Sequence, residues 1–255
     1  MLQRALPTVL LSRRGLLAAG VGAGMSVAMP KVAALASAPL SEWPAKRLRV
    51  MGARLTRIEA KIGHGNFNLS SFDDVRKAAR SPGIGALTVH EEAEFEALFA
   101  LDARRIGFLG PRVTHSLSAA LPIAGLLAVA GTGQHVFPEA LAVYERARRA
   151  VGTQLIVTSG ARGVAKQMLV FINSTLRSGV IARTVHSVAP PGYSYHAVGD
   201  IDVGDRHLGG VNFTAAFANS TTYKKIAALD FIHFRYPIHN TFGVQFEPWH
   251  LQIAK

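Results

Sequence analysis

Apolar residues recur along much of the chain at the spacing of amphipathic helices. Over residues 88–105 they fall at i, i+3, i+4 and i+6 among four glutamates, which predicts a helix with one buried face. A second helix is predicted over 138–150, because Pro138 suits a first helical turn. A third is expected over 167–177, and the string Ser70-Ser71-Phe72-Asp73-Asp74 predicts a further helix start within 66–79.

The strand signals are shorter and less regular. Residues 39 to about 60 are polar and basic, and are expected to be a linker that leads into a short helix or strand. The other predicted elements are strands over 154–158, 231–235 and 242–253, the last interrupted at Pro248, and a helix over 213–229. Helices and short strands therefore mix without regular alternation, which favours an α+β fold.

Two further apolar runs are too short to cross a membrane as helices. Leu16–Met29 and Leu117–Ala130 each span about 14 residues, whereas a transmembrane helix needs about 20. The second run is expected to be buried core. The first follows Ser12-Arg13-Arg14 and precedes a small-residue cleavage site at Ala36-Ser37-Ala38. This layout predicts a twin-arginine signal peptide over 1–38 and export to the periplasm or cell envelope, with a retained signal anchor as the alternative.

Charge and composition narrow the possible partners. The formal net charge is +12, and four of the cations lie in residues 1–38, which leaves +8 on the rest of the chain. A basic surface suits nucleic acids, acidic lipids and anionic cell-wall polymers. The chain has no dense run of five cations and no aromatic-plus-basic pattern, so nucleic-acid binding is not expected. Cysteine is absent, so any metal must be held by His, Asp or Glu.

Two of the ten histidines stand in contexts that favour chemistry. His196 lies in Pro191-Gly192-Tyr193-Ser194-Tyr195-His196, followed by Gly199, Asp200 and Asp202; His250 ends Glu247-Pro248-Trp249-His250. On a strand, the two aspartates share one face, and only one of them needs to reach a site. The other eight histidines are expected to be structural or exposed: His64, His90, His115, His135, His186, His207, His233 and His239.

Two imidazoles and one carboxylate are a suitable ligand set for catalytic zinc. They leave a coordination position for water and a net positive charge that lowers the pKa of that water. Glu247, three residues before His250, is a candidate for the base that takes its proton. Gly199 would allow a tight backbone path between the two early ligands. The spacing alone would often arise by chance, so it does not decide whether the chain has a metal site.

The motifs resemble those of the VanY-type D-alanyl-D-alanine carboxypeptidases, zinc peptidases related to VanX dipeptidases and phage endolysins. Besides the two histidine motifs, two further strings match in order: Ser159-Gly160-Ala161-Arg162 with Gln167, and the run from Phe231 to Pro237 followed by Thr241-Phe242-Gly243-Val244. The resemblance implies an α+β fold with a small mixed or antiparallel sheet flanked by helices. It covers 134–255 as a peptidase domain and leaves 39–133 as a helical segment of uncertain role, a cap or a wall-binding segment.

The resemblance also assigns the site residues. It implies that His196, Asp202 and His250 bind zinc and that Glu247 is the general base. It also implies that Arg162 stabilises the developing oxyanion. Three further residues are implied to bind substrate: Ser194, Gln167 and Trp249. The expected reaction is hydrolysis of the terminal D-Ala–D-Ala bond of peptidoglycan peptides.

Three departures from the family pattern leave the substrate open. Position 161 is Ala where an aromatic residue is common, position 163 is Gly where Ser is common, and His250 is followed by Leu251 and not by a basic-aromatic continuation. The alternatives are an endopeptidase or L,D-carboxypeptidase of the same chemistry, or an inactive wall-binding relative. No membrane span is expected after signal removal, and the sequence leaves the oligomeric state open.

Overall fold

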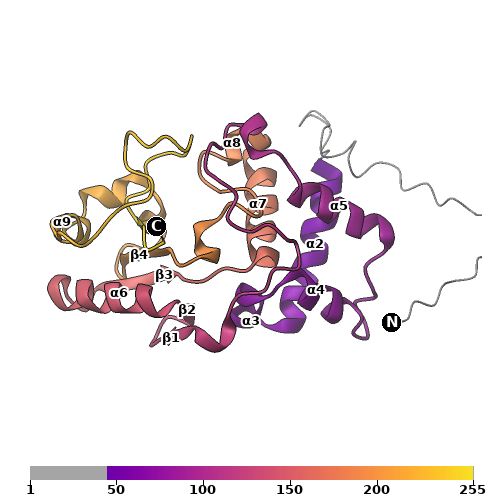
Figure 1. Ribbon diagram of the computed structural model, residues 1–255, viewed down its shortest axis with the longest axis horizontal. Coiled ribbons are helices and arrows are strands. Elements are labelled where there is room, and N and C mark those ends of the chain that lie inside the picture. Colours follow the sequence, from indigo (N-terminus) through magenta and orange to yellow (C-terminus); the bar gives the residue numbers. More distant parts are fainter. Residues whose placement is uncertain (1–44, 255) are drawn as a thin grey trace, which may run out of the picture. The chain divides into compact units, whose positions relative to one another are not determined.

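The computed structural model describes residues 45–254 (Figure 1). The predicted signal peptide, 1–38, lies outside the described residues. The α-helices are α2 (Ala45–Ile62), α3 (His64–Leu69), α4 (Phe72–Ala79), α5 (Val89–Phe99), α6 (Pro138–Val151), α7 (Val164–Ser178), α8 (Ile181–Thr184) and α9 (Thr221–Ala227). The strands are β1 (Leu127–Val129), β2 (Gln134–Val136), β3 (Leu155–Ser159), β4 (Ile201–Asp205) and β5 (His250–Leu251). Short 3₁₀ helices are η2 (Ala103–Ile106), η3 (Ile123–Gly125), η4 (Tyr195–Ala197), η5 (Gly209–Phe213) and η6 (Ala215–Asn219).

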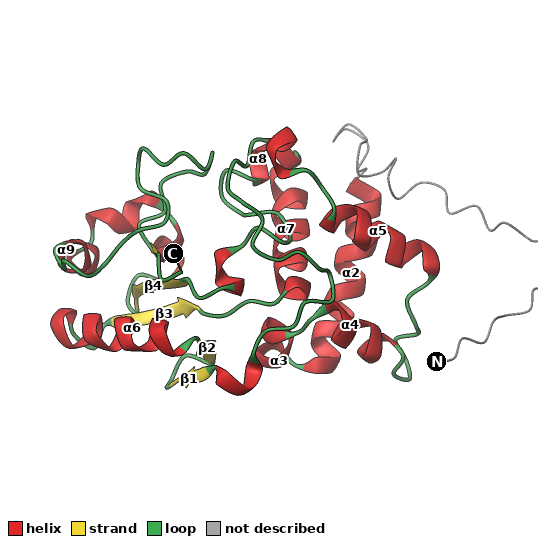
Figure 2. Ribbon diagram, in the orientation of Figure 1, coloured by secondary structure: helices red, strands yellow, loops and turns green. Residues whose placement is uncertain are grey.

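The strands form two small antiparallel sheets (Figure 2). β1 and β2 make a hairpin, and β4 lies between β3 and β5 in the second sheet. In this sheet Asp202 of β4 pairs with Ser159 on one side and with His250 on the other. The predicted α+β class with a small antiparallel sheet is therefore confirmed, and the strand register places two of the predicted ligands side by side.

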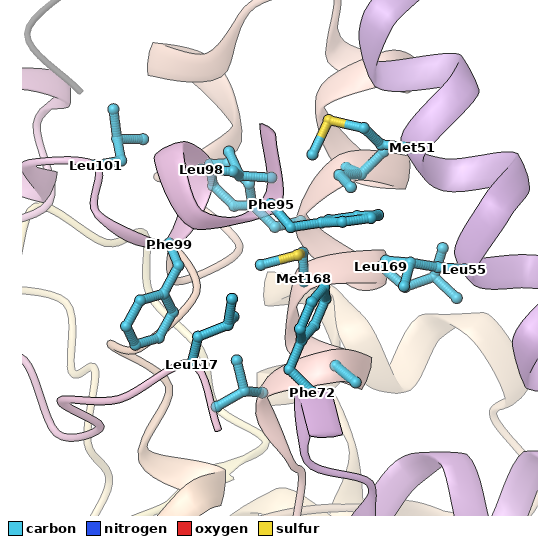
Figure 3. Close-up of a cluster of buried hydrophobic side chains, with 14 of the residues drawn as sticks. Met51, Leu55, Phe72, Phe95, Leu98, Phe99, Leu101, Leu117, Met168 and Leu169 are labelled. Carbon is cyan, nitrogen blue, oxygen red and sulfur yellow. The ribbon is translucent and has the colours of Figure 1, made fainter. Parts of the chain in front are cut away.

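A helical core joins α2–α5 to α7 (Figures 1 and 3). On α2 four apolar side chains recur at helical spacing and are 3% exposed or less: Leu48, Met51, Leu55 and Ile58. α2 approaches α7 closely at Gly52, where an added Cβ would lie 3.1 Å from Cγ2 of Ile172. Phe72 and Phe95 pack against each other with ring centroids 5.0 Å apart. Residues from both sides of the predicted boundary at 134 thus share one core.

A second core lies between the three-stranded sheet, α6 and α9. Leu155 and Val203 contribute its sheet side, and Phe217 and Ile226 come from the segment after β4. Tyr144 of α6 donates from its hydroxyl to the carbonyl of Leu155 over 3.1 Å, which fixes the helix against β3. The helix predicted over 138–150 and the strand predicted over 154–158 both form within a residue of their expected ends.

Several predicted elements are wrong in extent. The linker predicted over residues 39 to about 60 is wrong over the described part of that stretch, because α2 begins at Ala45 and its apolar positions are interleaved with Arg and Lys. The helix predicted over 88–105 ends at Phe99, and only α9 is α-helical within 213–229. The helix expected within 66–79 is interrupted before Ser71, which caps α4, so a helix does start within the predicted string.

The late strands and the second apolar run also differ from expectation. The strand predicted over 231–235 reduces to one bridge between Phe234 and Leu251, and the one predicted over 242–253 reduces to β5. Within 117–130 the chain is largely exposed, with Ile123 at 52% and Leu127 at 42%. Its prolines and glycines favour turns and a short hairpin, so few of its apolar side chains reach a core. Over residues 45–254, none of the helices has the length and apolar character that crossing a membrane requires.

Candidate metal centre

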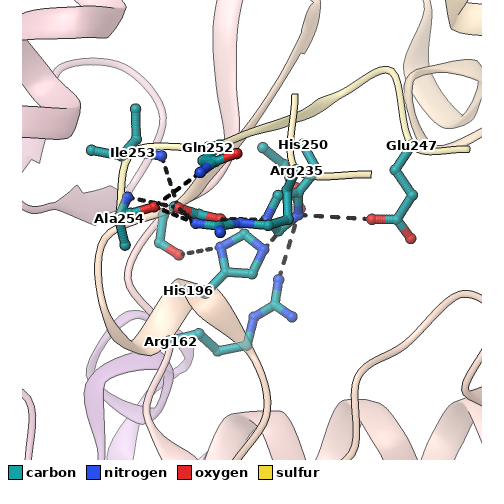
Figure 4. Close-up of polar contacts among 11 residues, drawn as sticks. Arg162, His196, Arg235, Glu247, His250, Gln252, Ile253 and Ala254 are labelled. Carbon is teal, nitrogen blue, oxygen red and sulfur yellow. Dashed lines mark hydrogen bonds and ion pairs between the residues drawn. The ribbon is translucent and has the colours of Figure 1, made fainter. Parts of the chain in front are cut away.

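Three predicted ligands from three different elements meet in one buried cluster, and Figure 4 shows two of them, His196 and His250. His196 lies on η4, Asp202 on β4 and His250 on β5. Each side chain offers one ligand atom, and these atoms lie within 4.8 Å of one another. The three residues are between 3% and 6% exposed. Gly199, with φ at +131°, turns the chain between His196 and Asp202, as its position in the motif predicted.

A backbone carbonyl fixes the ring of His196. Its Nδ1 lies 3.0 Å from the carbonyl oxygen of Gly160, which only accepts, so Nδ1 carries the hydrogen and donates it. Nε2 is then the free nitrogen, and it lies 3.3 Å from Oδ2 of Asp202. Burial lowers the pKa of His196, which favours the neutral imidazole that a metal requires. His196 is thus oriented as a ligand.

His250 lies between two carboxylates. Its Nδ1 is 3.0 Å from Oδ1 of Asp202, and its Nε2 is 3.1 Å from Oδ2 of Asp200. Asp200 is fully buried and accepts further hydrogen bonds from Arg235 Nε at 2.8 Å and Nη2 at 3.0 Å. The backbone N–H groups of Ile253 and Ala254 also donate to it, at 2.8 and 3.0 Å. Asp200 therefore holds the rear of the His250 ring and leaves Nδ1 facing the cluster, the arrangement typical of ligand histidines.

The charges in the cluster favour a cation. Burial alone would lower the pKa of His250, but the carboxylates of Asp200 and Asp202 raise it to about 10. Burial alone would raise the pKa of Asp200, but the donors of His250 and Arg235 hold it at about 2. The pKa of Asp202 is likewise far below its usual range, against the effect of burial, because of the two histidines. Without a metal, a protonated His250 thus balances the two buried carboxylates, and a bound cation would take over that role as the proton leaves.

The side chains present fit a zinc ion. Oδ1 of Asp202 is buried and, among the described residues, accepts no hydrogen bond, even though His250 Nδ1 is close to it. A buried carboxylate oxygen without a donor is costly, and a cation would satisfy it. Two imidazole nitrogens and one carboxylate oxygen also form the ligand set of many catalytic zinc sites. His196, Asp202 and His250 are therefore the residues that would hold the metal.

Glu247 lies beside the cluster without joining it. Its Oε2 is 3.8 Å from Nδ1 of His250, and the residue is 5% exposed. Burial raises the pKa of Glu247 to about 8. A cation held by the neighbouring ligands would favour the ionised carboxylate. The position and the proton affinity of Glu247 both suit a group that exchanges a proton near neutral pH.

Arg162 approaches the cluster from the turn after β3 (Figure 4). Its Nη2 donates to Ser159 Oγ over 2.6 Å and lies 3.9 Å from Oδ2 of Asp202; its Nη1 donates to Gln167 Oε1 over 2.9 Å. Gln167 in turn donates to the carbonyl of Ala189 over 2.6 Å. Burial lowers the pKa of the Arg162 guanidinium. Both hydrogen-bonding atoms of the Gln167 amide are engaged, which fits a residue that positions Arg162.

A cavity of about 470 Å³ opens from this centre. The predicted substrate residues Ser194 and Trp249 line it, at 5% and 6% exposure, together with Arg162, Gln167 and Glu247. Trp249 also packs in the sheet-side core, so it supports the wall of the cavity. All eight side chains assigned from the resemblance thus line a single cavity: Arg162, Gln167, Ser194, His196, Asp202, Glu247, Trp249 and His250.

The helical segment before residue 134 contributes to the same cavity. His64 and Asn68 of α3 line it. The N–H of Gly163 donates to the carbonyl of Asn68 over 2.8 Å, and an added Cβ at Gly163 would lie 2.3 Å from the carbonyl oxygen of Ser70. The backbone after α3 therefore explains why glycine occupies position 163. Ala161 packs against Leu69 in a small apolar cluster, so two of the departures from the family pattern lie where this segment meets the site.

Three further residues of the centre were not assigned from the sequence. Asp200 reaches the centre as well as Asp202, although only one of the two acids was needed. Its alternation with Asp202 along the strand was the available signal. Ser159 and Arg235 stand in recognised strings, but their partners, Arg162 and Asp200, depend on tertiary contacts that no spacing encodes.

A buried His-Asp-His group with an adjacent carboxylate and arginine is the side-chain set of a metal-dependent hydrolase. Residues 134–254 match the family model of VanY, D-alanyl-D-alanine carboxypeptidase. This match confirms the resemblance of the motifs to that family over this part of the chain. A comparison with curated proteins found no match.

Solved structures similar to the chain include three peptidases. One is the vancomycin-resistance D,D-pentapeptidase VanY of a VanB-type resistance cassette in complex with Zn(II), with 22% identity, a TM-score of 0.39, and coverage of 57% of this chain and 87% of that one. The second is the D,D-dipeptidase VanXYg with a D-Ala-D-Ala phosphinate analogue, with 20% identity, a TM-score of 0.47, and coverage of 60% and 65%. The third is the LD-carboxypeptidase LdcB, with 26% identity, a TM-score of 0.37, and coverage of 47% and 59%.

Proposed function

We propose that this protein is a zinc-dependent carboxypeptidase of the bacterial cell envelope that removes the terminal D-Ala from peptidoglycan peptides ending in D-Ala–D-Ala. The observation that carries the proposal is the VanY-family match over the segment that supplies the buried His196, Asp202 and His250. Glu247 is the other acid that lines the cavity. It lies next to the ligands without being one of them, where a base is needed.

His196, Asp202 and His250 hold the zinc ion in this proposal. Zinc supplies an activated water near neutral pH and polarises the scissile carbonyl. The three side chains are preorganised for this, because Gly160 orients His196 and Asp200 orients His250. Preorganised ligands reduce the rearrangement that accompanies metal binding.

Glu247 and Arg162 act on the reacting atoms. The Glu247 carboxylate accepts the proton of the attacking water and delivers it to the leaving amine of D-Ala. The Arg162 guanidinium, held by Ser159 and Gln167, donates to the oxygen of the attacked carbonyl as negative charge develops there. Ser194 and Trp249 form the wall against which the terminal residue lies.

Export belongs to the same proposal. The twin-arginine layout of 1–38 sends the protein across the inner membrane to the periplasm or cell envelope, where peptidoglycan is found. The +8 charge of the remaining chain favours association with anionic wall polymers.

A different cut by the same chemistry is the second candidate. The departures at Ala161 and Gly163 lie on the substrate side of the centre and leave the ligands intact. An endopeptidase or an L,D-carboxypeptidase would use the same metal, base and arginine on another bond. Digestion of defined muropeptides followed by mass measurement of the products separates these specificities.

The decisive experiment compares the parent protein with His250→Ala for zinc content and release of D-Ala. We expect about one zinc per chain and D-Ala release in the parent, and loss of both in His250→Ala, because that variant removes one of three ligands. His233→Ala is the matched control, since His233 is exposed and its side chain makes no hydrogen bond or ion pair with the described residues. Zinc without D-Ala release would retain the site and favour another wall peptide. A parent without stoichiometric metal would contradict the proposal.

A further inference from the structure

The cavity extends from the metal centre along one side of α7. Besides Gln167, four residues of that helix line it at positions i, i+4, i+8 and i+11, which lie on one helical face: Lys166, Val170, Ser174 and Arg177. Ser187–Ala189 and Val244–Gln245 also line it, and the Gln245 N–H donates to the His186 carbonyl over 2.8 Å, so these two segments lie side by side. We call this part of the cavity the α7 groove. α7 itself stands between the N-terminal helices and the sheet (Figure 1).

The α7 groove has no negative charge of its own. Among the described residues that line the cavity, the acids are Asp202 and Glu247, and both belong to the metal centre. Lys166 is paired with Glu59 at 2.7 Å, which largely neutralises it. The side chain of Arg177 makes no hydrogen bond or ion pair with any residue of the described range, and it is exposed at the far end of the groove. The groove therefore presents one unpaired cation away from the metal.

Two buried polar atoms indicate that a polar ligand enters the cavity. Oδ1 of Asn68 and Oγ1 of Thr158 both belong to lining residues, and both are buried without a hydrogen-bond partner in the described part of the chain. Such atoms are costly unless a ligand or water satisfies them. The N–H groups of a bound peptide would supply donors to both.

The length of the groove sets the reach of that peptide. Gln167, which positions Arg162, and Arg177 are ten positions apart on α7, so they are separated by about 15 Å along the helix axis. An extended peptide advances about 3.3–3.6 Å per residue, so about four residues span that distance.

We propose that the α7 groove binds the amino-terminal part of an acidic peptide, and that Arg177 pairs with a carboxylate three or four residues before the bond that is cut. This inference rests on the proposed function for the position of that bond. It names a specificity-determining residue, Arg177, and a substrate class: a peptide that ends in D-Ala–D-Ala and carries a negative charge well before its end. A free D-Ala–D-Ala dipeptide would leave the groove empty.

The test uses the full chain and N-acetylated hexapeptides that end in D-Ala–D-Ala and carry either Glu or Gln at the second or third residue. For one of the two Glu positions, we expect kcat/KM of the Glu peptide to exceed that of the matching Gln peptide about fivefold. This factor corresponds to the binding free energy of a partly exposed ion pair. In Arg177→Gln that ratio falls to about one. Arg183→Gln, which removes the same charge from an exposed residue outside the cavity, keeps the ratio. High salt reduces the ratio in the parent.

Calorimetric titration of the same peptides separates this inference from the proposed function. If none of the peptides releases D-Ala, the proposed function fails, and the ratio of the dissociation constants of the Glu and Gln peptides still decides the role of the groove. A Glu preference that is lost in Arg177→Gln and kept in Arg183→Gln supports the inference. Equal affinity and equal kcat/KM for the two peptides in the parent would overturn it, as would a preference that survives in Arg177→Gln.

Discussion

The helical core around α7 and the polar centre between β4 and β5 are both almost completely buried, yet different forces hold them together. In the helical core, side chains such as Phe72 and Phe95 are 0% exposed and contact other apolar side chains. In the polar centre, Asp200 is also 0% exposed, but it is surrounded by the donors of His250, Arg235 and the backbone of the last residues.

The helical core and the polar centre contribute differently to stability and to chemistry. Apolar burial contributes about 25 cal/mol per Å² of buried apolar surface, so the helical core is a net source of stability. Burial of an ion pair costs about as much as the pairing returns, so the polar centre contributes geometry more than stability. α7 contributes to both regions: Ile172 faces α2, and Gln167 holds Arg162 beside the polar centre.

The largest expected effect comes from Glu247→Gln, which should remove chemistry and leave stability intact. Glutamine keeps the shape of the side chain but cannot accept the proton, so we expect kcat to fall about 10²–10⁴-fold. Burial raises the pKa of Glu247 to about 8, so the metal-free protein at neutral pH holds mainly the neutral acid, which a neutral amide resembles. Steady-state kinetics measures the fall in kcat, metal analysis measures the zinc content, and a thermal melt measures the stability.

The zinc content of Glu247→Gln distinguishes a base from a ligand. Glu247 lies 3.8 Å from Nδ1 of His250 and outside the His196, Asp202 and His250 cluster, so the variant should bind zinc as the parent does. Turnover lost together with zinc would show that Glu247 is a ligand and would break the assignment of roles within the polar centre.

Asp200→Asn is expected to disturb both stability and metal binding. The amide would turn an NH₂ group toward donors of Arg235 or the backbone and would leave the guanidinium buried without its counter-charge. Loss of one partner of a buried pair lowers the unfolding free energy by about 3–5 kcal/mol. Since Asp200 also orients His250, zinc affinity should fall about 10–100-fold.

Urea unfolding of the metal-free protein and zinc competition with a chelator measure the two effects of Asp200→Asn. Asp230→Asn is the control, because the Asp230 side chain is 91% exposed. Unchanged zinc affinity in a folded Asp200→Asn protein would mean that His250 is held by its other neighbours, such as the ring of Tyr236 at 5.0 Å.

The residues of the polar centre could be predicted from sequence to a large extent, because four ordered motifs resemble those of a known family, whereas the spacing of possible ligands alone left the metal site undecided. His196, Asp202 and His250 lie together although 54 positions separate the first from the last. The roles of Asp200 and Arg235 were not predicted, since Asp200 accepts hydrogen bonds from both Arg235 and the ligand His250. Such pairing depends on the strand register and not on any local spacing.

The fold around the centre was predictable only where the local pattern was strong. α6 has a first-turn proline and a regular apolar face, and its bounds were predicted closely. α2 was missed because Arg and Lys separate its four buried apolar residues, and their helical spacing became meaningful only against α7. β5 is two residues long and exists because β4 offers it an edge, so its extent is a tertiary property.

The smallest expected effect, in Ile172→Val, tests whether the two regions are separable along α7. Ile172 is 0% exposed on the α2 side of the helix, so loss of one methyl group should lower the unfolding free energy by about 0.5–1.5 kcal/mol. Ile238→Val, at a site that is 68% exposed, is the control and should change nothing measurable. We expect kcat/KM of Ile172→Val to stay within about twofold of the parent, because a packed helix absorbs so small a deletion without shifting its other face. A larger loss of activity at full folding would show that packing against α2 sets the position of the cavity wall, and the helical core would then be part of the active site and not only its support.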